Sequence, residues 1–391
     1  MKPLNGGICA VDGIRAWGVR DGRNGLAIIL AEEEGCAAAV YTRNRIIAAP
    51  LIVTRRHLES QKGRIKGIVV NSGNANAYTG KRGIEDAERT CDLLAERLGC
   101  SGSEILVAST GIIGRPLQMD LITEQIEKIL PLLRSENRAS ERVASAIMTT
   151  DTYPKEYAVE TDQGLRVGGV AKGSGMIAPD MGTMLAFITT DAKLPPETLH
   201  ECLKRSVDES FNMIVVDGDT STNDMAVLIS TGERECREET FQEALDTVSI
   251  ELAKMIARDG EGATKLIEVT TTGAKTRSDA KRVTKTIITS PLVKTAVFGG
   301  DPNWGRIIAA AGRSKAEINP EKITLQLSDS KKDAVIIENG RVEGATDEAA
   351  SIMKSETVKI HIDLGIGKES ATGWGCDLSY DYVRINAEYT T

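Results

Sequence analysis

Hydroxyl side chains, rather than histidines or metal ligands, are the groups in this chain that best suit catalysis. The 391 residues include three histidines, and no recognisable motif contains His57, His200 or His361. A Ser–His–Asp enzyme or a His-ligated metal enzyme therefore has no support beyond the presence of these residues. A threonine can act without histidine when the chain is cut before it. Its new α-amino group, with a pKa of about 7.7–8.0, then acts as the base.

The pair Gly182-Thr183 meets the requirements of that chemistry. A small residue precedes the threonine, and residues 184–188 form a continuous apolar run that is typical of a buried strand. A lysine or an aspartate with an ordinary pKa would be a poorer base near neutral pH. Because pairs of a small residue and a threonine are common in proteins, this pattern alone does not define a function.

The motifs of several other enzyme classes are incomplete in this sequence. The segment GIGKES at Gly365 lacks the Walker spacing, and DGEGATK at Asp259 lacks the third glycine of a dinucleotide fingerprint. No G-x-S-x-G elbow surrounds Ser174. A nucleotide-dependent enzyme is therefore the weaker alternative.

Composition and charge are those of an ordinary globular protein. The chain is 41% hydrophobic and 27% charged, which excludes a disordered chain, a collagen-like chain and a disulfide scaffold. Its 48 basic and 56 acidic residues give a net charge of −8. We expect no nucleic-acid partner, because proteins that bind nucleic acid usually have a basic face.

Cysteine spacing and the N-terminus predict a cytoplasmic protein with reduced thiols. The seven cysteines are scattered and form no C-x-x-C pair, so neither a disulfide framework nor a cysteine metal site is expected. The N-terminus lacks the basic start and apolar run of a signal peptide. The longest apolar runs, such as residues 26–31, are far shorter than the ~20 residues that a membrane span needs. We therefore expect no membrane association.

Helix and strand patterns alternate along the chain, and its length predicts two lobes rather than one core. Residues 84–98 place apolar side chains three or four apart and end at Gly99, so a helix is expected there. A second helix is expected from an N-cap at Thr240 to a stop at Gly260. A mixed α/β fold follows, with strands expected at residues 67–73, 104–110, 183–192, 225–231, 265–272 and 322–329.

Five segments that follow or end these elements are rich in glycine and small polar residues. Glycine permits tight turns and a close approach of the backbone to a ligand. A single segment of this kind would most simply be a surface loop, but five of them favour a polar small-molecule site. They are residues 71–80, 108–114, 172–183, 217–224 and 298–306.

The segment KGSGMIAPDMGTMLAFITTDA, residues 172–192, closely resembles the cleavage region of the ornithine acetyltransferase family, the bifunctional glutamate N-acetyltransferases of arginine biosynthesis. Further counterparts follow the family's order along the whole chain: NSGNANAYTG, ASTGIIGRPL, MTTDTYPKE, VDGDTSTNDM, RDGEGATK, GGDPNWGRI and WGCDLSYDYVRINAEYTT. The resemblance implies an α/β sandwich of stacked sheets flanked by helices. That fold is shared with self-cleaving aminopeptidases and is distinct from the Ntn-hydrolase fold.

The resemblance also implies roles for individual residues. Thr183 matches the nucleophile, which self-cleavage after Gly182 would free, so that residues 1–182 form an α chain and residues 183–391 a β chain. Thr110 and Gly111 match the oxyanion-hole pair, which would stabilise the tetrahedral oxyanion formed when Thr183 attacks an acetyl group. The matched substrate contacts are Thr183 itself, a threonine of residues 149–152, Lys172, Glu261, Asn386 and Thr391; among the threonines Thr152 is favoured, and Thr150 comes second.

Two residues depart from the family pattern. The family usually has asparagine where Asp180 stands and alanine where Gly182 stands. Gly182 should ease a strained cleavage geometry, whereas Asp180 adds a carboxyl group near a developing oxyanion. We expect these departures to affect the rate of cleavage more than its occurrence.

The implied activity is a ping-pong acetyl transfer. N²-acetylornithine gives its acetyl group to Thr183, ornithine leaves, and glutamate takes the acetyl group as N-acetylglutamate. Some members of the family also use acetyl-CoA, and the motifs do not separate the two types. The resemblance implies no metal or organic cofactor, and a heterotetramer of two α and two β chains. The alternatives are a self-cleaving aminopeptidase, which would not need Glu261 or the C-terminal INAEYTT, and a binding protein without catalysis.

Overall fold

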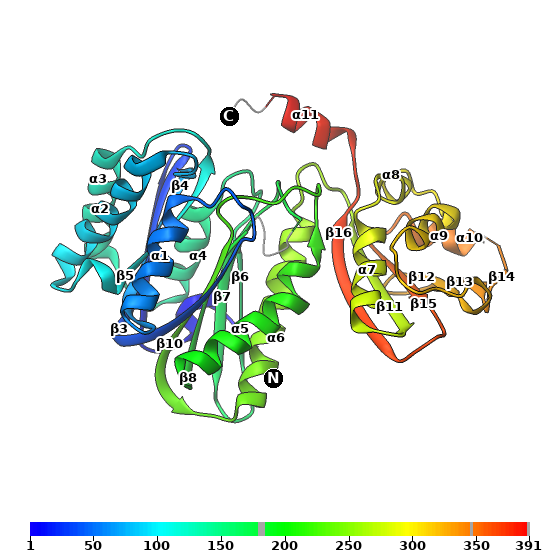
Figure 1. The fold of residues 1–391 in the computed structure, drawn as a ribbon, viewed down its shortest axis with the longest axis horizontal. Coiled ribbons are helices and arrows are strands. Elements are labelled where there is room, and N and C mark those ends of the chain that lie inside the picture. Colours follow the sequence, from blue (N-terminus) through cyan, green and yellow to red (C-terminus); the bar gives the residue numbers. More distant parts are fainter. Residues whose placement is uncertain (179–183, 345–346, 389–391) are drawn as a thin grey trace. The chain divides into compact units, whose positions relative to one another are not determined.

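The computed structural model describes residues 1–178, 184–344 and 347–388. These residues divide into two compact units, each with its own sheet. Unit 1 contains the described residues of 1–212 and 219–252, and unit 2 those of 213–218 and 253–388. The predicted mixed α/β fold, with two sheets and helices, is confirmed, as is the expectation of two lobes (Figure 1).

Among the described residues, unit 1 is built on a nine-stranded mixed sheet. The strands follow the order β1-β6-β7-β8-β10-β3-β4-β5, and β2 pairs with β3 outside this path. The long strand β3 contains the apolar run Leu26 to Ala31, whose side chains are all buried. The strands are β1 (Lys2–Leu4), β2 (Ile14–Asp21), β3 (Asn24–Tyr41), β4 (Arg64–Asn74), β5 (Ile105–Ile112), β6 (Lys155–Glu160), β7 (Arg166–Lys172), β8 (Leu185–Lys193) and β10 (Met225–Glu235).

The helices of unit 1 cover this sheet, with α1 against β5, α5 against β3, and α4 against β2 and β3. They are α1 (Ala49–Ser60), α2 (Gly80–Leu98), α3 (Met119–Ile129), α4 (Asn137–Ile147) and α5 (Pro196–Glu209), and α6 (Glu238–Arg258) contributes residues to both units. The helix predicted at residues 84–98 is confirmed as α2, and Gly99 ends it with a φ of 69°. The N-cap predicted at Thr240 is wrong, because α6 begins at Glu238. Two glutamates in its first turn interact favourably with the helix dipole.

Unit 2 carries a seven-stranded sheet among the described residues, in the order β14-β13-β12-β15-β11-β16-β9. Helix α7 packs on β11 and β16. The strands are β9 (Ile214–Val215), β11 (Leu266–Ala274), β12 (Thr324–Ser328), β13 (Asp333–Glu338), β14 (Arg341–Val342), β15 (Thr357–Asp363) and β16 (Glu369–Cys376). The helices are α7 (Arg277–Ile288), α8 (Pro291–Gly299), α9 (Trp304–Gly312), α10 (Asp347–Ile352) and α11 (Tyr380–Glu388).

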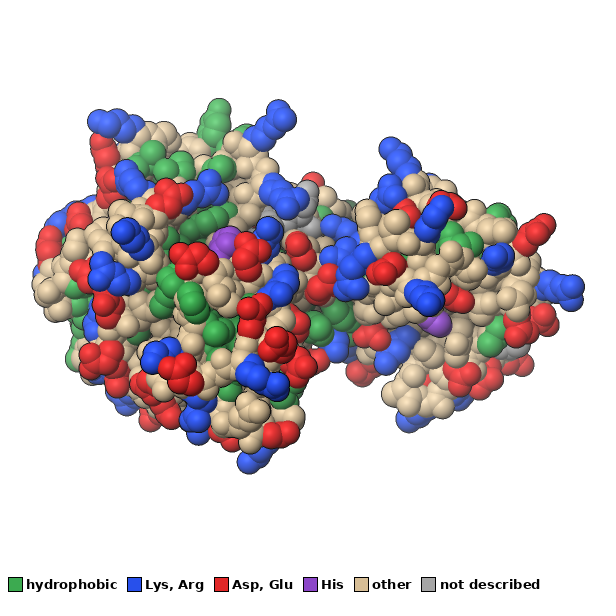
Figure 2. Space-filling view, turned by 60° about the horizontal axis from the view of Figure 1, so that its bottom comes forward, with side chains coloured by type: hydrophobic (Ala, Val, Ile, Leu, Met, Phe, Trp, Pro, Cys, Tyr) green, Lys and Arg blue, Asp and Glu red, His purple; other side chains and the backbone are tan. Residues whose placement is uncertain are grey.

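Surface features agree with the mixed charge of the sequence. On the face shown in Figure 2, Lys and Arg side chains lie among Asp and Glu side chains. None of the helices formed by the described residues is long and apolar enough to cross a membrane. All seven cysteines lie in the described part of the chain, and each is free.

Candidate active site

The ends of four neighbouring strands in the sheet of unit 1, β7, β8, β10 and β3, lie in one row, and β8 begins shortly after the predicted cleavage point in the sequence. Lys172, the last residue of β7, pairs with Leu185 of β8. Leu185 pairs with Met225 of β10, which in turn pairs with Tyr41 at the end of β3. Gly182 and Thr183 lie outside the described residues, and Met184, the next residue along the chain, accepts a hydrogen bond from the Met225 amide at 3.1 Å.

The predicted oxyanion-hole residues lie at the end of β5 and contact this row. The Lys172 ammonium donates a hydrogen bond to the Thr110 hydroxyl at 3.3 Å, so two residues predicted from the sequence are brought together. Gly111 has a φ of 131°, and a Cβ atom there would lie 2.3 Å from the Gly73 carbonyl carbon. A side chain is therefore excluded at this position for both backbone and steric reasons.

The threonines of residues 149–152, which precede β6, differ in exposure and in the contacts of their hydroxyl groups. The Lys172 ammonium donates to the Thr149 hydroxyl at 2.8 Å, and the Thr150 hydroxyl lies 2.7 Å from that of Ser174. Thr152, which the sequence favoured, has an exposed side chain. Thr149 therefore contacts Lys172 directly.

A buried ion pair supports the same region, and sequence reasoning did not single it out. Asp151 accepts hydrogen bonds from the Lys155 ammonium at 2.8 Å, the Gly173 amide at 2.7 Å and the Thr149 amide at 3.0 Å. Burial alone would raise the pKa of Asp151, but the ammonium groups of Lys172 and Lys155 lower it to about 2. Asp151 and Lys155 both stand in the segment MTTDTYPKE. Their opposite charges, four residues apart, are the sequence feature that could have predicted this ion pair.

Asp224, the residue immediately before β10, is a second buried carboxyl group that the sequence reasoning missed. Its side chain is 2% exposed, and its backbone carbonyl accepts from the Thr42 amide at 2.9 Å. Burial raises the pKa of Asp224 well above its usual value, although the Lys172 ammonium acts in the opposite direction. The sequence feature that could have identified Asp224 is its position as the last polar residue before an apolar run.

The loop before Asp224 connects this row to the ends of β4 and β5. The Asn223 side-chain amide donates to the Ala75 carbonyl at 2.6 Å and to the Ser109 carbonyl at 2.9 Å. A polar cavity of about 260 Å³ adjoins the same strand ends and includes Gly73 and Ile112 in its lining. Several of the glycine-rich segments therefore converge in unit 1, as expected, but residues 298–306 lie in unit 2, at the turn between α8 and α9.

In unit 2, the structure brings together Glu261 and Asn386, two of the predicted substrate contacts. The Asn386 side-chain amide on α11 donates to the Glu261 carboxylate at 2.8 Å and to the Tyr382 carbonyl at 3.0 Å. The Asn386 side chain is exposed, and that of Glu261 is half-buried. Thr391, the third contact predicted near this point, lies outside the described residues.

The turn that carries Glu261 is fixed by its neighbours. Asp377 accepts hydrogen bonds from the amides of Thr264 at 2.8 Å and Lys265 at 2.9 Å. Gly262 has a φ of 69°, and a Cβ atom there would lie 2.5 Å from the Tyr382 amide nitrogen. The backbone that follows Glu261 therefore has little freedom, while the Glu261 side chain stays partly exposed.

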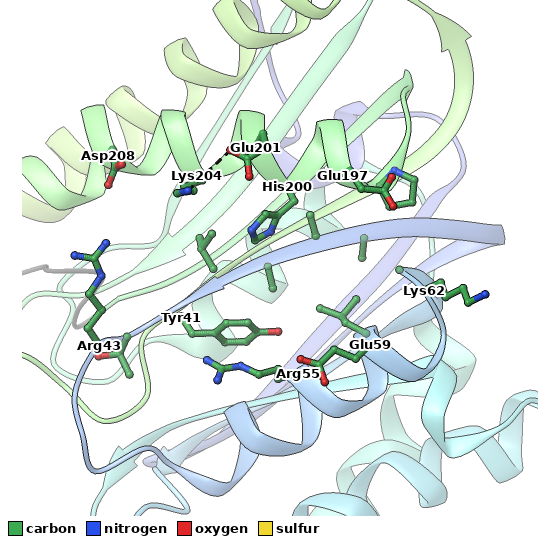
Figure 3. Close-up of a pocket in the computed structure, with 18 residues that line it drawn as sticks. Tyr41, Arg43, Arg55, Glu59, Lys62, Glu197, His200, Glu201, Lys204 and Asp208 are labelled. Atoms are coloured by element: carbon green, nitrogen blue, oxygen red, sulfur yellow. Dashed lines mark ion pairs between the residues drawn. The ribbon is translucent and has the colours of Figure 1, made fainter.

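A groove of about 860 Å³ lies elsewhere in unit 1, between α1 and α5 (Figure 3). Alanines of β3 form its floor, Tyr41 lies between the helices, and polar and charged side chains such as His200, Arg55 and Glu59 line its rim. No residue predicted from the sequence to act in catalysis or substrate binding lines it.

The family comparison covers nearly the whole chain. A model of the ArgJ family matches residues 11–391. The chain belongs to the ArgJ family. It is similar to the glutamate N-acetyltransferase of Methanosarcina mazei, with 51% identity over the full length of both chains. It is also similar to the arginine biosynthesis bifunctional protein ArgJ of Archaeoglobus fulgidus, with 45% identity over 98% of this chain and 100% of that protein.

Solved ArgJ structures are similar to part of the chain. The bifunctional ArgJ of Bacillus halodurans matches 52% of this chain and 98% of its own, with 44% identity and a TM-score of 0.48. An ornithine acetyltransferase of Mycobacterium tuberculosis, solved with ornithine, matches 46% of this chain and 98% of its own, with 34% identity and a TM-score of 0.43. The predicted family is confirmed, and the relatives' names agree with the predicted enzyme class, an acyltransferase.

Proposed function

We propose that this ArgJ-family chain transfers the acetyl group of N²-acetylornithine to glutamate in arginine biosynthesis. The observation that carries this proposal is the match to proteins named glutamate N-acetyltransferase over the full length of both chains. The products are ornithine and N-acetylglutamate, and Thr183 carries the acetyl group between the two half-reactions. No step requires a metal or an organic cofactor.

Self-cleavage between Gly182 and Thr183 precedes transfer in this proposal. It converts the amide nitrogen of Thr183 into an amine that accepts the hydroxyl proton. The products are residues 1–182 and 183–391. Their association is supported by the pairing of β7 with β8, from Val167 opposite Thr190 to Lys172 opposite Leu185, because these strands lie on either side of the cut. Two copies of each chain form the proposed cytoplasmic heterotetramer.

The oxyanion that forms on the acetyl carbonyl is stabilised in this proposal by the Thr110 hydroxyl and the Gly111 amide. Lys172 supports this assignment because its ammonium donates to Thr110, leaving the Thr110 hydroxyl proton available for another acceptor. The same ammonium attracts the substrate carboxylate, together with a hydroxyl of Thr150 or Thr152. Glu261 binds the ornithine ammonium, and Asn386 and Thr391 bind the carboxylate end.

The test combines chain analysis with an exchange assay. Mass spectrometry and N-terminal sequencing of the purified protein should find two chains, one beginning Thr-Met-Leu-Ala-Phe. Acetyl exchange between labelled acetylornithine and glutamate should accompany them, and acetyl-CoA is added as a second donor to decide whether it also serves. A fully intact chain with exchange activity would contradict the mechanism, and a cleaved chain without exchange would contradict the substrates.

Substitution of the nucleophile sharpens that test. Thr183→Ala should abolish both cleavage and exchange, whereas Thr183→Ser should retain part of each because a hydroxyl remains. Thr247→Ala removes a hydroxyl from α6 that donates to the Glu243 carbonyl, and this matched control should behave like the unmodified chain. Exchange by the Thr183→Ala variant would show that the nucleophile lies elsewhere.

A further inference from the structure

The two residues proposed to form the oxyanion hole lie where the sheet of unit 1 is irregular. Strands β4 and β5 keep their register as far as Gly73 opposite Gly111, and the register shifts at Asn74. The regular ladder is therefore interrupted beside Thr110 and Gly111, and irregularities of this kind are frequent next to active sites. Oxyanion donors act only if they are held in place before the reaction, so another group must hold this part of the backbone.

The side-chain amide of Asn223 spans the two strands at this irregularity. It donates at 2.9 Å to the Ser109 carbonyl, which belongs to the peptide bond that precedes Thr110. It also donates at 2.6 Å to the Ala75 carbonyl, and the Ala75 amide in turn donates to the Ile112 carbonyl at 2.9 Å. The contacts of Asn223 therefore reach the backbone on both sides of the proposed oxyanion hole.

Neighbouring hydroxyl groups hold Asn223 in this orientation. The Thr222 hydroxyl donates to Asn223 Oδ1 at 2.6 Å, and the Asn223 backbone amide donates to the Ser221 hydroxyl at 3.1 Å. Asn223 is 5% exposed, and both ends of its side-chain amide are hydrogen-bonded. Because two carbonyl groups face this side chain, a donor is required, and a carboxylate of the same shape would not serve.

The sequence motif that contains Asn223 has no other role in the proposed reaction. VDGDTSTNDM, residues 216–225, is one of the ordered segments that resemble the family. Its part in unit 1 also bonds to the end of β3, where the Thr42 hydroxyl donates to the Ser221 carbonyl at 2.9 Å. Asn223 is thus carried by a loop that is attached to three strands of the same sheet, β3, β4 and β5.

We propose that Asn223 is the positioning residue of the oxyanion hole. By holding the two carbonyl groups, it fixes the directions of the Thr110 hydroxyl and the Gly111 amide. Asn223 acts through these donors and moves no proton itself. This inference rests on the proposed function, because it applies only if Thr110 and Gly111 stabilise the oxyanion.

The first experiment measures acetyl exchange by Asn223→Ala, which lacks both donors. Misplacement of reacting groups by about 1 Å costs about 100-fold in rate, so kcat per cleaved chain should fall at least about tenfold. The KM for acetylornithine should change less than about twofold, because substrate contacts are kept. Asn212→Ala is the matched control: Asn212 is also buried in unit 1, and its amide donates to the Asp208 carboxylate at 2.7 Å. The control should keep the unmodified kcat, and an unmodified kcat in Asn223→Ala would overturn the proposal.

Coupling to Thr110 separates positioning from a general structural role. In a Thr110→Val chain, Asn223→Ala should lower kcat by less than about a further threefold, because one of the donors that it positions is already gone. A loss by the same factor in both backgrounds would overturn the proposal, since Asn223 would then act independently of Thr110.

A milder variant decides the matter where Asn223→Ala yields no folded chain. Thr222→Val removes only the hydroxyl that donates to Asn223 Oδ1 and leaves both amide donors in place. It should lower kcat by about threefold with little change in KM. An unchanged kcat in Thr222→Val would contradict the proposal.

Failure of the proposed function has a different signature. If the unmodified chain shows no exchange, or if Thr110→Val keeps the unmodified kcat, the proposed reaction or its oxyanion hole fails irrespective of Asn223. If Thr110→Val loses activity while Asn223→Ala keeps it, the oxyanion hole stands and only the positioning role fails.

Discussion

The candidate residues of unit 1 and those of unit 2 occupy opposite physical environments. In unit 1, Lys172 and Asp151 are nearly fully buried and hydrogen-bonded to several partners at strand ends. In unit 2, Glu261 is half-buried and Asn386 is exposed on a helix near the end of the described chain. The first group is fixed by a sheet, whereas the second is joined by a single hydrogen bond between side chains.

The difference indicates how each group should respond to substitution. Charges in a low-dielectric environment interact strongly, and removing one member leaves its partner unpaired and buried. Exposed groups exchange a protein partner for water at little cost. Substitutions in unit 1 should therefore affect folding and chemistry, whereas those around Glu261 should affect the preference among substrates.

The largest expected effect is on stability, from Asp151→Asn. Removing the carboxylate breaks the buried ion pair with the Lys155 ammonium, which should lower the free energy of unfolding by about 3–5 kcal/mol. Asp381→Asn breaks the exposed pair with Arg384 in unit 2 and should change it by less than about 1 kcal/mol. Urea unfolding of both variants checks the contrast, and equal losses would mean that burial does not distinguish the two units.

The same carboxyl group predicts how stability changes with acid. The pKa of Asp151 is lowered to about 2 in the folded chain, against about 3.9 in an unfolded one. Its contribution is therefore fully present above about pH 4 and is lost as the pH falls toward 2. Urea unfolding between pH 2 and 5 should show a smaller pH slope for Asp151→Asn than for the unmodified chain.

A smaller effect, on the chemical step, is expected from Thr110→Val. Valine keeps the shape of threonine but removes the proposed oxyanion donor, which should lower kcat by about 100- to 1,000-fold, or 2.7–4 kcal/mol. Thr270→Val is the matched control in unit 2, where the hydroxyl lies 3.1 Å from that of Thr372. It should leave kcat unchanged, and exchange kinetics with both substrates measure the difference. A normal kcat for Thr110→Val would remove Thr110 from the oxyanion hole.

The smallest effect is expected from Glu261→Gln, and it should be selective. A charge-assisted contact with the ornithine ammonium becomes a neutral one, so kcat/KM for acetylornithine should fall about tenfold while the glutamate half-reaction changes little. Glu268→Gln is the control, because Glu268 accepts a hydrogen bond from the Trp374 indole at 2.9 Å in the same unit. A uniform loss in both half-reactions would contradict the proposed role of Glu261.

Much of the local structure could be predicted because it depends on neighbouring residues. The spacing of apolar side chains and the left-handed Gly99 define α2, and the apolar runs before and after the polar loops become β4, β5 and β10. The start of α6 was missed by three residues, because a threonine and a glutamate are both acceptable near a helix N-terminus. The motifs around Thr110, Lys172 and Glu261 were sufficient to predict the family.

What the sequence determined by itself is the set of chemical groups, their order along the chain and the family that shares them. Only the tertiary structure decided which groups touch: Lys172 donates a hydrogen bond to Thr149, and Asn386 reaches Glu261 across 125 residues of chain. It also decided that Asp151 and Asp224, both ordinary aspartates in the sequence, have pKa values shifted in opposite directions. The physical reason is that the burial of both carboxyl groups, and contacts such as that of the Gly173 amide with Asp151, depend on segments distant in sequence, so no local pattern encodes the local dielectric.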